Sequence, residues 1–110
     1  MITIVETTCS SREQAEELAK AAVTNKLSAC CHIMPIDSCY EWKGEAVQEK
    51  ETLLRMKTTE EVLPKLLLFL EKNHPYDIPE IIAYKVEHAS QKYLSWVTSF
   101  CKVVGVSCDR

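Results

Sequence analysis

Residues 30–57 read CCHIMPIDSCYEWKGEAVQEKETLLRMK, and this stretch decides the fold. Polar and apolar residues alternate with a period of two, which is the spacing of a β-strand. One strand face then carries Cys30, His32, Met34, Ile36, Ser38, Tyr40 and Trp42. Lys43-Gly44 predicts a tight turn, and Glu45 to Lys57 returns as a second strand. Each arm has about a dozen residues, roughly twice the common strand length, so the pattern predicts an unusually long hairpin.

The tip of this hairpin is expected to project from the domain. Residues 48–51 read Gln-Glu-Lys-Glu, which places charge on both strand faces and excludes a two-sided core. Tyr40 and Trp42 lie near the same tip. Large aromatics on an exposed ribbon are unfavourable in water unless a partner covers them. Because Trp and Tyr are typical interface anchors, we predict a symmetric homo-oligomer with Tyr40 and Trp42 in its interface.

The remaining pattern predicts two further strands and three helices. We expect strands at 2–8 and 81–86, and helices at 11–25, from about 60 to 74, and from the Ser90 cap to about Cys101. Capping boxes are predicted at Ser10 with Glu13 and at Thr58 with Glu61. Residues 103–110 form a short apolar run with a polar end.

This order predicts an α+β fold of the ferredoxin-like, split βαβ type. Right-handed crossovers place the first two helices on one face of a four-stranded antiparallel sheet, and the third helix is an addition. With 110 residues, 46% of them hydrophobic and no linker or repeat, the chain is expected to form one domain, residues 1–110.

Composition excludes several classes of partner. The net charge of −3 is unfavourable for nucleic acid binding, and no apolar run approaches the roughly 18 residues of a membrane span. The N-terminus lacks the basic and apolar regions of a secretory signal, so we expect a cytoplasmic protein. Six cysteines without a Cys-x-x-Cys pair then indicate free thiols rather than disulfides or structural zinc.

The segment from His74 to Glu80, HPYDIPE, is a stiff connector between a helix and a strand. Its two prolines fix their own φ and bias the preceding residues toward extended backbone. Such rigidity suits residues that must be held in place, here Tyr76 and Glu80 at a cleft. The alternative is a helix stop, in which His74 simply hydrogen-bonds to backbone.

Several motifs together resemble one family. They are Lys26-Leu27-Ser28-Ala29-Cys30, Ser38-x-Tyr40-x-Trp42-x-Gly44, Lys57-Thr58, His74-Pro75-Tyr76-x-x-Pro79-Glu80 and Tyr93-Leu94-x-Trp96. In order and spacing they are similar to the CutA family of divalent-cation tolerance proteins. The resemblance covers residues 2 to about 100 and implies a homotrimer whose hairpins pair between subunits, similar in structure to PII-type signalling trimers.

The resemblance also implies two kinds of function. The first is a metal-binding or metal-responsive trimer, with copper as the candidate ion and Cys30 and His74 as ligands. Thiolate and imidazole suit copper, although strand alternation also predicts that Cys30 is substantially buried. The alternative is a PII-like trimer that binds a small anionic ligand or a protein partner in intersubunit clefts lined by Lys57, Tyr76 and Glu80. Nucleotide-binding loops and His-Glu-x-x-His are absent, so we expect no enzyme activity and no required cofactor.

Overall fold

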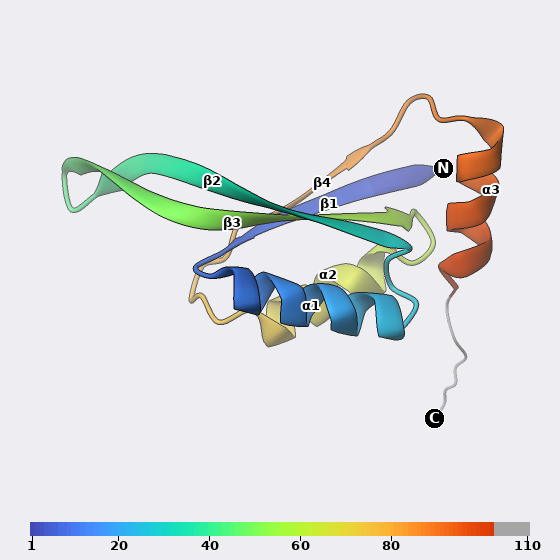
Figure 1. The fold of residues 1–110 in the computed structure, drawn as a ribbon, viewed down its shortest axis with the longest axis horizontal. Coiled ribbons are helices and arrows are strands. Elements are labelled where there is room, and N and C mark those ends of the chain that lie inside the picture. The colour runs from blue at the N-terminus through green and yellow to red at the C-terminus, as the bar shows by residue number, and fades with distance from the viewer. Residues whose placement is uncertain (103–110) are drawn as a thin grey trace.

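The computed structural model describes residues 1–102 and consists of one sheet with three helices (Figure 1). The elements in chain order are β1 (Ile2–Cys9), α1 (Arg12–Thr24), β2 (Cys30–Trp42), β3 (Glu45–Thr59), α2 (Leu63–Asn73), β4 (Ile81–Lys85) and α3 (Gln91–Phe100). This is the predicted α+β arrangement, strand-helix-strand twice with an added third helix. The predicted apolar run at 103–110 lies outside the described residues.

The four strands pair in the order β2-β3-β1-β4, and every neighbouring pair is antiparallel. This is the ferredoxin-like order, so that prediction is confirmed. In the hairpin, Cys30 lies opposite Lys57 and Trp42 opposite Glu45. Pro35 is tolerated inside β2 because β2 is an edge strand with one unpaired side.

The hairpin turn lies at Lys43 and Gly44, as predicted. Both residues have positive φ, 52° and 84°, which matches a type I′ turn and the right-handed twist of the two arms. Figure 1 shows the hairpin reaching well beyond the helices. Near its tip Tyr40 is 42% exposed and Trp42 is 61% exposed.

Two predicted helix caps are wrong. The Ser11 hydroxyl, rather than that of Ser10, caps α1 by accepting from the Gln14 backbone N–H, while the Ser10 hydroxyl donates to the Gln14 side chain at 2.9 Å. Helix α2 begins at Leu63 with no side-chain cap, three residues after the predicted start. The reason is that β3 continues through Thr59, where it still pairs with β1.

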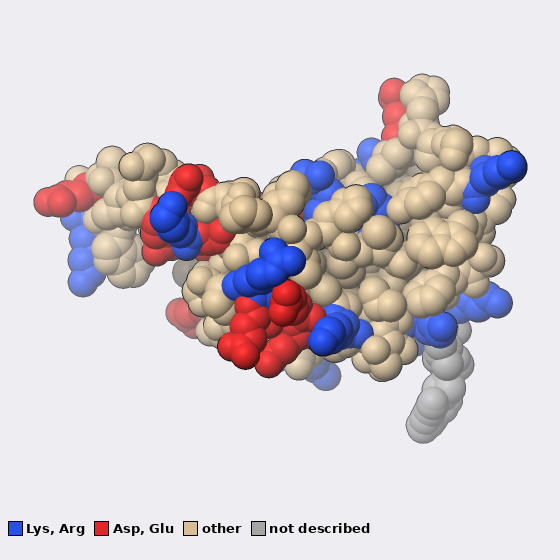
Figure 2. Space-filling model, in the orientation of Figure 1, with Lys and Arg blue, Asp and Glu red and all other residues tan. Residues whose placement is uncertain are grey.

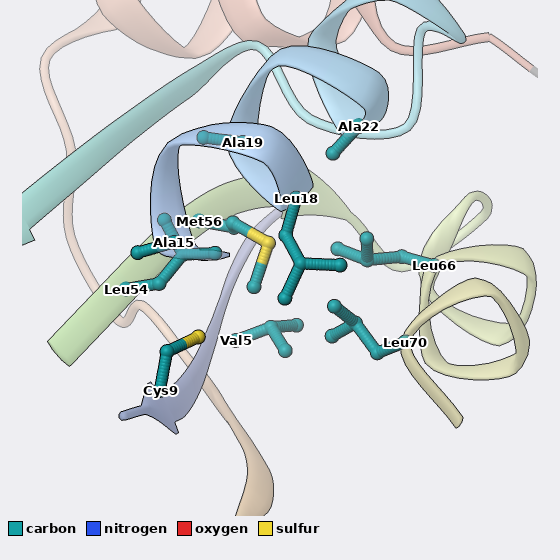
Figure 3. Close-up of a cluster of buried hydrophobic side chains, with 10 residues drawn as sticks. All are labelled: Val5, Cys9, Ala15, Leu18, Ala19, Ala22, Leu54, Met56, Leu66 and Leu70. Carbon is teal, nitrogen blue, oxygen red and sulfur yellow. The ribbon is translucent and has the colours of Figure 1, made fainter. Parts of the chain in front are cut away.

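Helices α1 and α2 cover one face of the sheet and enclose the main core (Figure 3). In α1 the buried positions are Ala15, Leu18, Ala19 and Ala22, the i, i+3, i+4, i+7 spacing of a helix face. The three alanines let the helix approach Val5, Leu54 and Met56 of the sheet, all of which are fully buried. The two predicted crossover helices therefore do share one face.

Within the described part of the chain, the opposite face of the sheet is covered at one end only. There α3 packs against β1, and the buried residues are Ile2, Ile4, Ala29, Val62, Val97 and Cys101. Figure 1 shows α3 standing at this end, and none of the other elements in residues 1–102 covers the rest of the face or the hairpin. We call this uncovered part the open face. It exposes 47% of Ile82 and 45% of Tyr84.

None of the helices among residues 1–102 is long and apolar enough to cross a membrane.

Candidate functional site

His74 fastens the stiff connector to the end of β1. His74 directly follows the last residue of α2, and only 8% of it is exposed. Nδ1 lies 3.1 Å from the Tyr76 backbone N–H, which can only donate, so Nδ1 accepts. The ring proton is then on Nε2, which donates to the Thr8 carbonyl at 2.8 Å. Both ring nitrogens are therefore used within the chain.

These two hydrogen bonds of His74 position Tyr76 against the hairpin. The edge of one ring meets the other, with the His74 and Tyr76 centroids 4.7 Å apart. The Tyr76 hydroxyl donates to one Glu51 oxygen at 2.9 Å, and Ser38 donates to the other at 2.6 Å. Burial, reinforced by the Glu51 carboxylate, raises the pKa of the Tyr76 phenol. Tyr76 therefore stays a neutral hydrogen-bond donor that ties the connector to both hairpin strands.

Between the connector and the hairpin lies a groove of about 700 Å³, which we call the connector groove. It is lined by Thr8, Ser10, Tyr40, Trp42, Glu49, Lys50, Glu51, Tyr76, Asp77, Ile78 and Glu80. Four carboxylates and one ammonium make its lining acidic. The groove brings together four of the predicted site residues, the cleft residues Tyr76 and Glu80 and the interface residues Tyr40 and Trp42.

Lys57 lies elsewhere. It is six residues from Glu51 along β3, which is about 20 Å in an extended strand. Its ammonium is 2.8 Å from Nδ1 of His32, on the open face. Within a single chain, therefore, the structure does not place Lys57 in one cleft with Tyr76 and Glu80.

Cys30 belongs to this second cluster. Its Sγ is 3.8 Å from Nε2 of His32, because residues two apart on a strand share a face. Cys30 is intermediate in burial, neither fully buried nor exposed, so the expectation of substantial burial is met in part. The adjacent Cys31 points to the other side, where it packs against the main core. Burial first, and then the nearby Cys30 thiol, raises the pKa of Tyr93 on α3.

The two predicted metal ligands are not neighbours in one chain. Cys30 aligns through Lys57 with Ile4 of β1, whereas His74 bonds to Thr8, four residues or about 13 Å further along that strand. Among residues 1–102 there is no group of three His, Cys, Asp or Glu side chains arranged to hold a metal ion.

The surroundings of His32 are also unfavourable for a metal ion beside Cys30. The Lys57 ammonium lies 2.8 Å from Nδ1 and 3.4 Å from Nε2 of the His32 ring, so a positive charge is close to both ring nitrogens. A metal ion at Nε2 would therefore sit near a positive charge. A complete copper site therefore does not fit the residues of a single chain.

Sequence reasoning gave too little weight to His32 and Glu51. His32 shares the period-two face with Cys30, so its approach to the thiol was visible in the pattern. The role of Glu51 depends on strand register and on the position of the connector, neither of which the local sequence reveals.

A model of the family described as CutA1 divalent ion tolerance protein matches residues 3–99. This chain belongs to that family. It is 41% identical to Protein CutA of Mus musculus over 91 residues, 82% of this chain and 51% of the relative. It is also 41% identical to the divalent-cation tolerance protein CutA of Thermus thermophilus over 95 residues, 86% of this chain and 92% of the relative.

A solved CutA1-family structure has the same fold. The CutA of Synechococcus elongatus superposes with a TM-score of 0.89 and 38% identity, covering 92% of this chain and 90% of that one. The chain spans about half the length of the mouse and human relatives that it matches. The family of divalent-cation tolerance proteins predicted from the motifs is thus confirmed.

Proposed function

We propose that this CutA1-family chain acts in divalent-cation tolerance as a non-enzymatic homotrimer. The observation that carries the proposal is the open face, which continues onto a projecting hairpin with an exposed tryptophan. Ile82, Tyr84 and Trp42 are each about half exposed or more, and monomeric proteins rarely leave so many large apolar groups on one continuous surface.

The geometry is compatible with a ring. The hairpin tip and the sheet centre are different surfaces, so a hairpin laid on a neighbour's sheet can repeat from copy to copy as a head-to-tail contact. Head-to-tail contacts close into a ring when the rotation fits. Three copies is the number implied by the family resemblance.

A pair of matched variants tests this assembly. Ile82 is 47% exposed on the open face and Leu68 is 53% exposed on α2, on the other side of the sheet. Ile82→Glu would bury a charge in the proposed interface, so we expect sedimentation to show mostly monomers at micromolar concentration. Leu68→Glu should sediment as wild type. Trimeric Ile82→Glu would contradict the proposal.

We further propose that a neighbouring subunit completes the connector groove, giving a PII-like intersubunit cleft. Its four carboxylates, Glu49, Glu51, Asp77 and Glu80, favour a positively charged group over the small anionic ligand considered from sequence. Lys57 can still line such a cleft if it comes from another copy.

Copper binding is proposed to be weak and shared between subunits. Cys30 Sγ and His32 Nε2 are 3.8 Å apart, close to the separation of two ligands of one ion, but further donors must come from a neighbour. Titrating the reduced protein with Cu(I) should give modest affinity, which Cys30→Ser abolishes and the exposed control Cys39→Ser preserves. Unchanged binding in Cys30→Ser would exclude this site.

The non-enzymatic assignment rests on the same cluster. The Cys30 thiol lies 3.8 Å from the His32 imidazole, and the Lys57 ammonium lies within hydrogen-bond distance of the same ring. An imidazole that accepts a hydrogen bond from an ammonium is a poor general base for the thiol. A cytoplasmic location stays a prediction, with which the free thiols of Cys9, Cys30, Cys31, Cys39 and Cys101 agree.

A further inference from the structure

A second groove lies on the helical side of the molecule, between the end of α1 and the length of α2. It has a volume of about 720 Å³. Its lining consists of Thr24, Asn25, Lys26, Leu27, Lys65, Leu68, Phe69, Lys72, Asn73 and Lys102. Four of these residues are lysines and none is acidic, so we call it the basic groove. Nothing in the proposed trimer uses it.

Helix α2 builds one wall of this groove with a stripe separate from its core stripe. Leu66 and Leu70 are fully buried in the main core. Lys65, Leu68, Phe69 and Lys72 have i, i+3, i+4, i+7 spacing and all line the groove. Leu68 remains 53% exposed. The wall therefore presents an apolar pair between two ammonium groups.

The lysine charges of the groove are not neutralised within the described chain. Arg12 and Lys85 have carboxylate partners at 2.9 and 3.0 Å, whereas Lys26, Lys65 and Lys72 form no ion pair among residues 1–102. On the face drawn in Figure 2, acidic and basic groups are intermixed along the hairpin and in the middle, whereas the end by the grey tail carries basic groups.

Lys26 is also held in place by the fold. It has φ of 63°, a left-handed conformation at the end of α1 that glycine adopts at lower cost. Its backbone N–H donates to the Val23 carbonyl, and that of Leu27 donates to the Ala22 carbonyl, the two bonds of a Schellman motif. The Lys26 ammonium lies 4.2 Å above the Phe100 ring, which fixes it at the groove's end.

We propose that the basic groove binds an acidic segment of a partner protein, with an apolar side chain seated between its carboxylates. The lysines supply charge complementarity, and Leu68 and Phe69 supply the apolar contact. A bilayer is a poorer partner because the groove is concave, whereas a membrane surface is flat on this scale.

A short, blocked, fluorescent peptide that alternates glutamate with leucine is a suitable probe. We expect the full chain to raise its anisotropy at low salt, and the double variant Lys65→Glu/Lys72→Glu to weaken binding about tenfold or more. Lys20→Glu is the matched control, since Lys20 is an exposed lysine of α1 outside the groove. It should change affinity less than about twofold.

A second variant tests the apolar contact without altering charge. Leu68→Ala should weaken the same peptide about threefold, because part of an exposed leucine would no longer be covered on binding. Equal affinity for wild type and Lys65→Glu/Lys72→Glu would overturn the proposal. So would equal affinity for a peptide with serine in place of leucine, or full displacement of the peptide by vesicles of anionic phospholipid at matched charge. Because the groove lies on the helical side, a monomeric protein would leave this test valid.

Discussion

The two faces of the sheet are built from the same strands but from different kinds of residue. Toward α1 and α2, Val5, Leu54 and Met56 are fully buried in an apolar core. On the other face, the Glu6 carboxylate accepts from Arg55 and from Tyr84, each at 2.8 Å, and His32 meets Lys57. The first face can stabilise a single protomer. The second combines directional polar pairs with exposed apolar groups, which is the composition of a surface that recognises a partner.

Two adjacent leucines on β3 allow the contributions of the two sheet faces to stability to be compared directly. Leu54 is fully buried on the covered face, whereas Leu53 is only partly buried on the open face. Leu54→Ala should lower the free energy of unfolding by about 3 kcal/mol through lost burial and the cavity left behind. Leu53→Ala should cost less than half as much when unfolding is measured with urea on dissociated protein. Equal losses would show that the two faces do not differ in this way.

A smaller loss of stability is expected when His74, which joins the connector to β1, is replaced. His74→Ala removes both the donor to the Thr8 carbonyl and the acceptor of the Tyr76 N–H. Leaving the buried Thr8 carbonyl and the part-buried Tyr76 N–H without these partners should cost about 2 kcal/mol in urea unfolding. His88→Ala is the control, because the His88 side chain is 92% exposed, and it should unfold like wild type. A comparable loss in both variants would remove His74 from its proposed structural role.

The polar network of the open face should give a still smaller, pH-dependent effect. Hydrogen bonds from Arg55 and Tyr84 lower the pKa of Glu6 below its ordinary 4.5. A lowered folded-state pKa contributes stability that is fully present above about pH 4.5 and is lost as pH falls through the folded value. Glu6→Gln should therefore lose less stability than wild type between about pH 5 and pH 3. Parallel pH profiles would mean that the ion pair contributes nothing measurable.

Local pattern was enough to predict the elements but not the contacts that join them. The arms of the hairpin were predictable because the pattern from Cys30 to Trp42 has a period close to two and Lys43-Gly44 favours a tight turn. The start of α2 was mispredicted because Thr58 and Glu61 imitate a helix cap. Pairing of β3 with β1 outweighs that local preference and keeps Thr58 in the sheet.

For the candidate sites, too, local sequence predicted individual residues but not the contacts between distant segments. Tyr76 and Glu80 could be assigned to a cleft because the prolines around them indicate rigidity. The partner of His74 could not be predicted, since Thr8 lies 66 residues away in sequence. Lys57 was grouped with Tyr76 by motif alone, and only the strand register separates it from the connector groove and places it beside His32.

The open face and the hairpin together form the proposed self-association surface. Light scattering behind a sizing column measures self-association most directly, on wild type and on Trp42→Ala. At micromolar concentration we expect wild type to have three times the 12.5 kDa mass of one chain. Trp42→Ala should dissociate at higher concentration, since truncating an interface anchor costs about 2 kcal/mol or more. A wild-type protein that elutes with the mass of one chain would contradict the account.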